Sequence, residues 1–552
     1  MLRIHQVKLT LDQWQRLSPE LLKTACAKTL KLPAEAIAEA KMRKRSVDAR
    51  DKGDVHFTLT VDISLTDSKR ESAIAAKYKP NQIALVEKPA PEKDVFSLTV
   101  QPWPRDALRP VVVGAGPAGL FCALALAVRG AKPILLERGQ PVDQRARDIE
   151  AFEAGSSLNT ESNVLFGEGG AGAFSDGKLT CGLSNPHIKT ILQTLHTCGA
   201  PEDILTSQRP HIGTDLLRPV LKNARERLIA LGGEVRFGCT LTGLVLRDGH
   251  VTGVRCQQQA NTDEFAADHV YLAIGHSARD TYQWLYDLGL PMEQKPFAVG
   301  ARIEHLQQNI NRAQYGKSAG HPALPQADYK LNAHTPDQRG VYTFCMCPGG
   351  QVIAATAEQD GVNVNGMSYH ARNSQNANAA LLVGVRPEDY GSDHPLAGVW
   401  FQREMETAAF RQTGGFKAPC QRVGDLMENR PTKAFGQVQP SYLPGVEMGE
   451  IRCCLPSYVI DNFRLAIPQL ARRLRGFDHP DAVLTAPETR SSAPLRMLRN
   501  QRRESPIGGL YPLGEGAGHA GGIVSAAVDG LLAGLDESSN QPPKTIHFNT
   551  SY

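Results

Sequence analysis

Apolar and polar residues recur with two different periods in the N-terminal part of the chain. LRIHQVKL and VHFTLTVDISL alternate at every second residue, as strands do, whereas PELLKTACAKTLKL and PAEAIAEAKMRK have helical spacing. Prolines and lysines then accumulate in KYKPNQ and EKPAPEK. We therefore predict a small α/β domain over residues 1–100 that ends in a linker.

Glycine and proline interrupt the next apolar run. Val111–Val113 predicts a short buried strand, LFCALALAVRG predicts a helix, and PILLE predicts a second strand. By length alone, residues 111–128 could span a membrane, but Gly114, Gly116 and Pro117 would break such a helix near its start. A strand–turn–helix unit explains the segment better, and we expect no membrane partner.

The turn between this strand and helix has the spacing of a dinucleotide site. Gly114 permits the tight turn, Gly116 lets a pyrophosphate approach the backbone, and Gly119 lets the helix pack on the strand. The pyrophosphate would lie at the helix N-terminus, where free N–H groups favour anions. Glu137, 18 residues beyond Gly119, is placed to hold ribose hydroxyls and argues against a 2′-phosphate. The residues expected to contact the cofactor here are Gly114, Ala115, Gly116, Pro117, Ala118, Gly119, Glu137 and Arg138.

A second glycine-rich turn near the C-terminus decides between FAD and NAD. The segment GGLYPLGEGAG predicts a short strand that ends in Gly514-Glu515, and HAGGIVSAAVDGLLAG predicts the helix that follows. This arrangement resembles the second FAD fingerprint of two-part flavoproteins, which implies that Glu515 binds the ribityl chain. Gly521, Gly522 and Ile523 would open a helix whose N–H groups stabilise negative charge on reduced flavin.

Two further segments fit the same cofactor. In HVYLAIGHSARD an apolar strand ends at Ala273 and Gly275, and the successive strands before it include Leu241, which we place near adenine. Five of the eleven residues from 167 to 177 are glycines. We expect the loop of residues 163–178 to pass the flavin and its phosphates. Gly169, Gly170, Ser175 and Lys178 would contact the cofactor there. The alternative for this loop is a flexible surface segment.

Composition narrows the class of protein. A chain of 552 residues suggests two or three domains, and a net charge of +4 gives no support for nucleic acid as the main partner. Eleven scattered cysteines and an N-terminus without an apolar stretch favour a reducing cytoplasm. No cysteine–histidine group has zinc spacing, so we expect no metal. Because no second GxGxxG has a strand and helix around it, NADH or NADPH would bind only transiently as an electron donor.

Seven motifs together resemble a family of bacterial FAD-dependent dehydrogenases. They are GAGPAG, FGEGGAGAFSDGKL, KPFAVGARIEH, FCMCPGG, VNGMS, ETRSSAPLR and GEGAGHAGGI, and the resemblance covers nearly the whole chain. It implies a bound FAD and an oxidoreductase activity without an established substrate.

Candidate catalytic residues lie mainly in the region between the two FAD segments. Cys345 and Cys347 could form a redox pair beside the flavin, although CxC suits a disulfide less than CxxC and a packed strand is the favoured interpretation. Arg302 or Arg490 could bind a substrate carboxylate, and His519 could pass protons. Glu304 and His305 are polar neighbours of Arg302, and we interpret Cys453-Cys454 as two buried small side chains.

These patterns predict an α/β protein with a Rossmann-type FAD-binding domain. That domain comprises residues 106–285 and 501–552, with an inserted mixed α+β substrate or cap domain over residues 286–500 and the small N-terminal α/β domain before it. We expect a FAD-dependent oxidoreductase that moves hydride through flavin N5 to or from a small molecule. The alternatives are a FAD-binding redox sensor or electron-transfer module, and an RNA-modifying flavoenzyme. The substrate, electron partner, oligomeric state and role of the N-terminal domain do not follow from the sequence.

Overall fold

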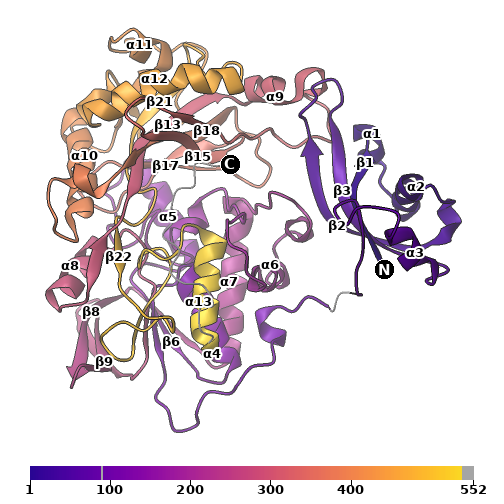
Figure 1. The fold of residues 1–552 in the computed structure, drawn as a ribbon. Coiled ribbons are helices and arrows are strands. Elements are labelled where there is room, and N and C mark those ends of the chain that lie inside the picture. Colours follow the sequence, from indigo (N-terminus) through magenta and orange to yellow (C-terminus); the bar gives the residue numbers. More distant parts are fainter. Residues whose placement is uncertain (89–90, 537–552) are drawn as a thin grey trace.

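A four-stranded antiparallel sheet forms the N-terminal domain of the computed structural model, which describes residues 1–88 and 91–536 (Figure 1). The strands lie in the order β2-β3-β1-β4, and the helices pack on one face. Their bounds are β1 Leu2–Leu9, α1 Leu11–Gln15, α2 Pro19–Leu30, β2 Ile37–Asp48, β3 His56–Leu65, α3 Arg70–Ala75 and β4 Ile83–Leu85. The small α/β domain is confirmed as a fold.

One predicted element in this domain is wrong. PAEAIAEAKMRK was expected to be helical, but only Ala34–Ala36 forms a short 3₁₀ turn, and the chain from Ile37 onward is strand β2. This strand pairs with β3 from Ile37↔Leu65 to Asp48↔His56. Pairing with a neighbouring strand outweighs a weak local preference for helix.

A parallel five-stranded sheet forms the predicted dinucleotide-binding domain. Its order is β23-β11-β5-β6-β7, so strands from distant parts of the chain lie side by side. The strands are β5 Val111–Val113, β6 Ile134–Glu137, β7 Glu234–Phe237, β11 Val270–Leu272 and β23 Leu510–Pro512. The helices that belong to it are α4 Pro117–Val128, α5 Val142–Glu153, α6 His187–Thr197, α7 Thr214–Ala230 and α13 Ile523–Leu535. The expected strand meander is present as β8 Cys239–Arg247, β9 His250–Gln258 and β10 Asn261–Ala266.

A mixed seven-stranded sheet forms the inserted domain. Its order is β14-β15-β18-β13-β21-β19-β20, and α12 packs against one face while the parallel-sheet domain lies on the other side (Figure 1). The strands are β13 Phe297–Leu306, β14 Asn332–His334, β15 Gly340–Cys347, β18 Asn376–Val385, β19 Ala418–Arg422, β20 Val446–Met448 and β21 Val483–Glu488. Two small ladders are β12 Met292–Gln294 with β22 Leu495–Met497, and β16 Gln351–Ala354 with β17 Val364–Met367. The helices are α8 Arg279–Asp287, α9 Gln307–Tyr315, α10 Ala397–Thr413, α11 Val423–Met427 and α12 Ser457–Arg473.

The apolar core confirms the predicted fold class. The core of the N-terminal domain and that of the inserted domain form one cluster, which includes Ile63 and Phe297, while α4 and α13 lie in a second cluster. Within the described ranges, no helix is long and apolar enough to cross a bilayer. The apolar run over residues 111–128 is instead β5, a turn and α4.

Candidate functional site

Four strands of the parallel sheet end at the same edge, and each continues into one of the predicted motifs. The Gly114 N–H donates to the Leu136 carbonyl at 2.7 Å, and the Ala273 N–H donates to the Val113 carbonyl at 2.8 Å. The turn after β23 joins them, since the Leu513 N–H donates to the carbonyl of Leu272 at 2.8 Å. Ligands of open α/β sheets bind beyond the carboxyl ends of the strands, so this edge is the candidate site.

The first turn fits a dinucleotide because side chains are excluded from it. Gly114 has φ of +98°, and a Cβ there would lie 2.3 Å from the Ala273 carbonyl oxygen. A Cβ on Gly119 would lie 1.8 Å from the Gly114 oxygen. Helix α4 begins at Pro117 without a side-chain cap, so N–H groups at its N-terminus are available to a pyrophosphate.

Glu137 connects three backbone segments at this edge. Its Oε2 accepts the Ala115 N–H at 2.7 Å, and its Oε1 accepts the N–H groups of Gly139 at 2.9 Å and Gly167 at 3.0 Å. A carboxylate has about four acceptor positions, so about one is left for a ribose hydroxyl. The side chain therefore orders the turn as well as being placed for the predicted ribose contact.

Arg138 joins the same region to the start of helix α8. Its guanidinium donates to Glu161 at 2.8 and 2.9 Å and to Asp280 at 3.0 Å, and it lies 4.3 Å from the centre of the Phe166 ring. These contacts place Arg138 over the glycine-rich loop.

Arg145 was missed in the sequence, and it holds that loop. This fully buried side chain on α5 donates to five backbone carbonyls of the loop: from Nε to Asn163, from Nη2 to Val164, and from Nη1 to Gly167, Glu168 and Gly170. Their donor–acceptor distances run from 2.7 to 3.2 Å. Burial lowers the pKa of Arg145 to about 10, which still leaves it charged at neutral pH. Helix α5 is rich in polar residues, and nothing in its sequence distinguishes Arg145 as the residue that anchors the loop.

The loop brings the two glycine fingerprints together. A Cβ on Gly170 would lie 3.1 Å from the Gly116 Cα, and one on Gly172 would lie 3.0 Å from Ile523 Cγ1. Helix α13 begins at Ile523 after Gly522, which has φ of +136°. The N-termini of α4 and α13 therefore lie on either side of one loop, as a cofactor that contacts both would require.

Glu515 has the features expected of a group that awaits a hydroxylated ligand. Within the part of the chain that the structure describes, its carboxylate makes no hydrogen bond, and it is only partly exposed. Burial raises the pKa of Glu515 to about 7, and nearby Lys295 partly offsets this. Tyr282 lies between the two turns beside Glu515, since its hydroxyl donates to the Gly516 carbonyl at 2.7 Å and also lies 3.2 Å from the Gly275 carbonyl oxygen. The glycine cradle, two open helix N-termini and an unpartnered carboxylate fit FAD.

Three other residues that the sequence placed near the cofactor are Leu241, Ser175 and Lys178. Leu241 is buried on β8, and Ser175 donates to the Gly172 carbonyl at 2.8 Å. Lys178 contacts Asp176 at 2.7 Å and approaches the Cys347 sulfur at 3.8 Å, so it links the loop to the inserted domain. Their contacts with FAD stay predictions.

Most candidate catalytic side chains have protein partners. Arg302 is fully buried and bonds Glu488 at 2.7 Å and the Cys345 carbonyl at 2.9 Å. His519 shares a 2.9 Å hydrogen bond with the Met497 carbonyl, and burial lowers its pKa to about 4. Arg490 forms a buried ion pair with Glu406 at 2.6 Å. These partners favour structural roles for all three side chains.

The other polar candidates are also tied to the inserted domain. Glu304 accepts from Ser441 at 2.6 Å, and His305 contacts the Phe477 carbonyl at 2.9 Å. Cys454 is buried and Cys453 is half-buried.

Cys345 and Cys347 differ in their surroundings. Cys345 is exposed and has φ of +41°, whereas Cys347 is buried. Desolvation by the surrounding protein raises the pKa of the buried Cys347 thiol. The Cys347 thiol is therefore not a reactive thiolate at neutral pH.

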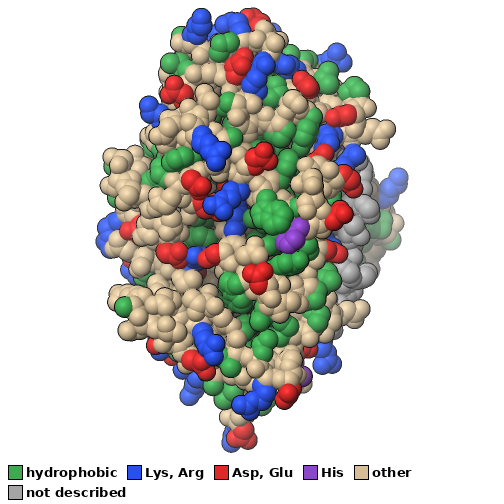
Figure 2. Space-filling model, turned by 90° about the vertical axis from the view of Figure 1, so that its left-hand side faces the viewer, with side chains coloured by type: hydrophobic (Ala, Val, Ile, Leu, Met, Phe, Trp, Pro, Cys, Tyr) green, Lys and Arg blue, Asp and Glu red, His purple; other side chains and the backbone are tan. Residues whose placement is uncertain are grey.

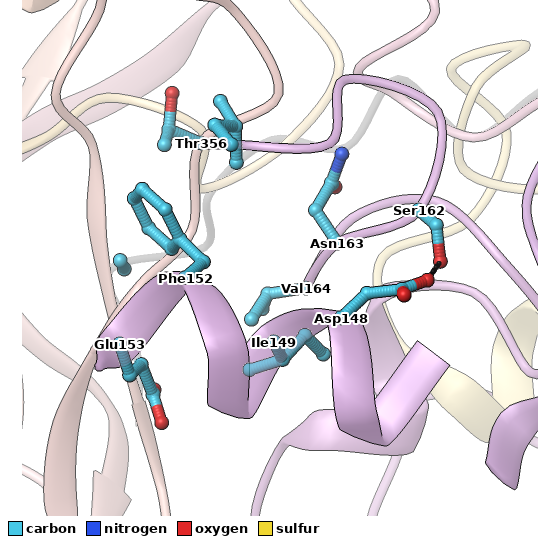
Figure 3. Close-up of a pocket in the computed structure, with 10 residues that line it drawn as sticks. Asp148, Ile149, Phe152, Glu153, Ser162, Asn163, Val164 and Thr356 are labelled. Atoms are coloured by element: carbon cyan, nitrogen blue, oxygen red, sulfur yellow. Dashed lines mark hydrogen bonds between the residues drawn. The ribbon is translucent and has the colours of Figure 1, made fainter. Parts of the chain in front are cut away.

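The small cavity in Figure 3 is a separate feature. Its volume is about 10 Å³, and it is lined by side chains that include Asp148, Phe152, Ser162 and Asn163. Asp148 accepts a hydrogen bond from Ser162 at 2.5 Å. This volume holds about one water molecule, so the cavity is not a substrate site.

Three parts of the chain match known families. Residues 1–64 match a domain of unknown function, residues 109–147 match a FAD binding domain, and residues 296–491 match the family described as FAD-dependent protein, C-terminal domain-like. An uncharacterized protein of Clostridium beijerinckii is 44% identical over 533 residues, which are 96% of this chain and 97% of the relative.

Solved structures share a more distant likeness. A 3-ketosteroid-Δ4-(5α)-dehydrogenase of Rhodococcus jostii is 13% identical with a TM-score of 0.33, over 80% of this chain and 98% of that one. A geranylgeranyl bacteriochlorophyll reductase-like protein of Thermoplasma acidophilum is 12% identical with a TM-score of 0.33, over 78% of this chain and 77% of that one.

Proposed function

This chain belongs to the family of FAD-dependent proteins that includes its clostridial relative, and from that premise we propose that it moves hydride between bound FAD and a small organic molecule. Its cofactor is FAD, and in general terms it is a flavin-dependent oxidoreductase. Bound FAD supplies hydride transfer at flavin N5. The residues around it bind, orient and set the charge of the site.

One observation carries this proposal: two helix N-termini meet at the carboxyl edge of the sheet with Glu515, whose carboxylate has no hydrogen bond among the described residues. The α4 N-terminus would hold the diphosphate, and Glu515 would bind hydroxyls of the ribityl chain. The N-terminus of α13 would favour negative charge on the flavin, which accumulates when the ring is reduced.

The inserted domain supplies the other side of the site. Its seven-stranded sheet faces the parallel-sheet domain, and Cys347 at the end of β15 meets Lys178 of the glycine-rich loop (Figure 1). The substrate would enter between these two parts. NADH or NADPH would reach the flavin by the same route and leave again.

A charge pattern bears on the RNA-modifying alternative. Figure 2 shows Lys and Arg side chains interspersed with Asp and Glu on the face that it presents. A nucleic-acid site is marked by basic side chains gathered in a patch or groove. The face in Figure 2 presents no such patch, and the FAD edge described above supports an oxidoreductase of small molecules as our preferred proposal.

The test is anaerobic reduction of the purified holoprotein. We expect a yellow protein whose flavin absorbance bleaches with NADH, NADPH or a member of a panel of metabolites. Gly114→Ala is the control, because its Cβ would meet the Ala273 carbonyl oxygen and prevent FAD binding. A flavin that stays oxidised with every donor would contradict turnover and favour the redox-sensor alternative.

A further inference from the structure

A buried carboxylate binds the second glycine turn to helix α13. Asp529 lies in the second turn of that helix, and its Oδ2 accepts the Gly514 N–H at 2.8 Å. Gly514 follows strand β23 and precedes Glu515. Asp529 therefore connects the turn that carries Glu515 to the helix that begins at Ile523.

Two arginines hold this carboxylate in place. Arg499 donates from Nη2 to Asp529 Oδ1 at 2.8 Å and from Nη1 to Oδ2 at 2.9 Å, and Arg503 donates from Nε to Oδ1 at 2.9 Å. Burial opposes ionisation of Asp529, but the two arginines hold its pKa below the usual range. Together with the Gly514 N–H, each carboxylate oxygen accepts two hydrogen bonds, which fills about four acceptor positions. Asp529 is therefore committed to the turn rather than to a ligand.

The same turn is held at its start and on its flank. Arg499 Nη1 also donates to the Pro512 carbonyl at 2.6 Å. A Cβ on Gly514 would lie 2.7 Å from the Ala118 Cβ, so the turn packs against the first residues of α4. Because these contacts are made by the backbone of the turn, the direction in which Glu515 points depends on them.

Open space adjoins the turns around Glu515. Apart from adjacent residues in the chain, no atom of the described residues lies within 4 Å of a Cβ built on Gly275, Gly521 or Gly522. Glu515 is partly exposed, whereas Asp529 is buried. The groups that border the open space are therefore Glu515 and the N-terminus of α13, and Asp529 fixes how they lie relative to each other.

We propose that Asp529 is a positioning residue for the flavin end of the cofactor, which holds Glu515 in register with the N-terminus of α13 without touching FAD. This inference rests on the proposed function. Glu515 and the helix N-terminus act on neighbouring parts of one ligand, the ribityl chain and the flavin ring. Such groups have to be held within about 0.5 Å of the productive geometry. The diphosphate end depends instead on α4 and Glu137.

Titration of the apoprotein with FAD and with ADP separates the two ends of the cofactor. FAD engages both ends, whereas ADP engages only the diphosphate end. Asp529→Asn keeps the shape of the side chain but offers one oxygen to the four N–H donors around it. We expect this variant to bind FAD at least roughly tenfold more weakly and ADP as tightly as wild type does. Gly114→Ala should bind neither ligand, which checks that ADP occupies the first turn.

The midpoint potential of the flavin is the second measurement, made on holoprotein with FAD in excess. A helix N-terminus favours the negative charge of reduced flavin, so a displaced turn should weaken binding of reduced flavin more than that of oxidised flavin. The potential of Asp529→Asn should then be more negative by about 30 mV for each tenfold difference between the two losses. Loss of stability alone would lower the free energy of unfolding and leave the potential unchanged.

Two further pairs of variants supply matched controls. Arg499→Met removes the bidentate partner of Asp529 and should weaken FAD in the same direction, whereas Arg502→Met, at the exposed arginine beside Arg503, should change nothing. Asp393→Asn removes a carboxylate that is exposed and should leave FAD, ADP and the potential unchanged.

The outcomes separate this inference from the proposed function. Equal losses of FAD and ADP affinity in Asp529→Asn, or an unchanged potential, overturn the positioning role, while reduction of the wild-type flavin by a donor is a separate result. If ADP does not saturate the wild-type apoprotein, the midpoint potential decides. If Asp529→Asn does not fold, the FAD affinity and potential of Arg499→Met against those of Arg502→Met decide the question in the same way.

Discussion

Single buried charges shape the backbone around the FAD edge. Glu137 accepts three N–H groups from three segments, and Arg145 donates to five carbonyls of one loop. Buried polar groups stay in place only when hydrogen-bonded, so each of these side chains determines the path of the backbone that it binds. Neither is required to touch a substrate in order to control affinity for the cofactor.

Replacing Arg145 with methionine should weaken FAD binding. Each buried carbonyl left without a donor costs about 1–3 kcal/mol, so the loop should lose its place against Gly116 and FAD affinity should fall at least roughly tenfold. Fluorescence titration of the apoprotein with FAD measures this. Arg147→Met is the control on the same helix, because Arg147 is exposed and, among the described residues, bonds only Gln144. Equal FAD affinities for the two variants would rule out the role of Arg145.

At the scale of elements, the close packing of α4 and α13 positions both fingerprints. A Cβ on Gly530 would lie 1.9 Å from the Ala118 carbonyl oxygen, and one on Gly534 would lie 2.6 Å from the Cys122 oxygen. The two helices therefore approach through glycines, and their N-termini keep a defined separation. The fold uses helix packing to set the distance between the diphosphate and flavin ends of its cofactor.

Gly530→Ala should force these helices apart. Overpacking costs about 1–3 kcal/mol, which exceeds the gain of up to about 1 kcal/mol from the better helix propensity of alanine. We expect a lower free energy of unfolding in urea and weaker FAD binding. Gly415→Ala is the control, since no atom of residues 1–88 or 91–536 lies within 4 Å of its added methyl group. Unchanged stability of Gly530→Ala would show that the helices can separate freely.

At the scale of the molecule, the N-terminal domain is joined to the rest through main-chain bonds. Strand β2 is an edge strand, and its outer side pairs with residues 206–208: the Arg45 N–H donates to the Thr206 carbonyl at 2.8 Å and the Gln208 N–H to the Arg45 carbonyl at 2.9 Å. Lys52 also donates to the Gln314 carbonyl. Covering an exposed strand edge prevents wrong pairing, so this docking stabilises the whole chain.

Arg45→Pro should loosen this junction more than Arg45→Ala. Proline removes the outward N–H that bonds Thr206, while an edge strand tolerates it. Alanine keeps this N–H and removes the ion pair with Asp203, worth about 0–1 kcal/mol, and the cation–π contact with Trp14, worth about 0.5–1 kcal/mol. We expect a lower unfolding temperature and faster proteolysis between residues 65 and 110 for the proline variant. Similar behaviour of both variants would contradict the main-chain junction.

The sequence by itself determined those parts of the cofactor site at which the backbone conformation requires a particular residue type. Gly114 needs a positive φ and Gly119 needs close helix approach, and only glycine satisfies both without regard to the rest of the chain. The same holds for the turn at Gly514, which has φ of +70°. The family resemblance rests on such positions and led to FAD and to an oxidoreductase.

Tertiary structure alone decided the features that depend on partners distant in sequence. Residues 37–48 form a strand because β3 is beside them, and Arg145 is a loop anchor because carbonyls 18 to 25 residues later surround it. Lys178 and Cys347 come from separate domains, so their contact follows only from how the inserted sheet lies on the glycine-rich loop. A local backbone requirement can be recognised from the residue type that satisfies it. Strand pairing, burial and charge balance exist only after the chain has folded.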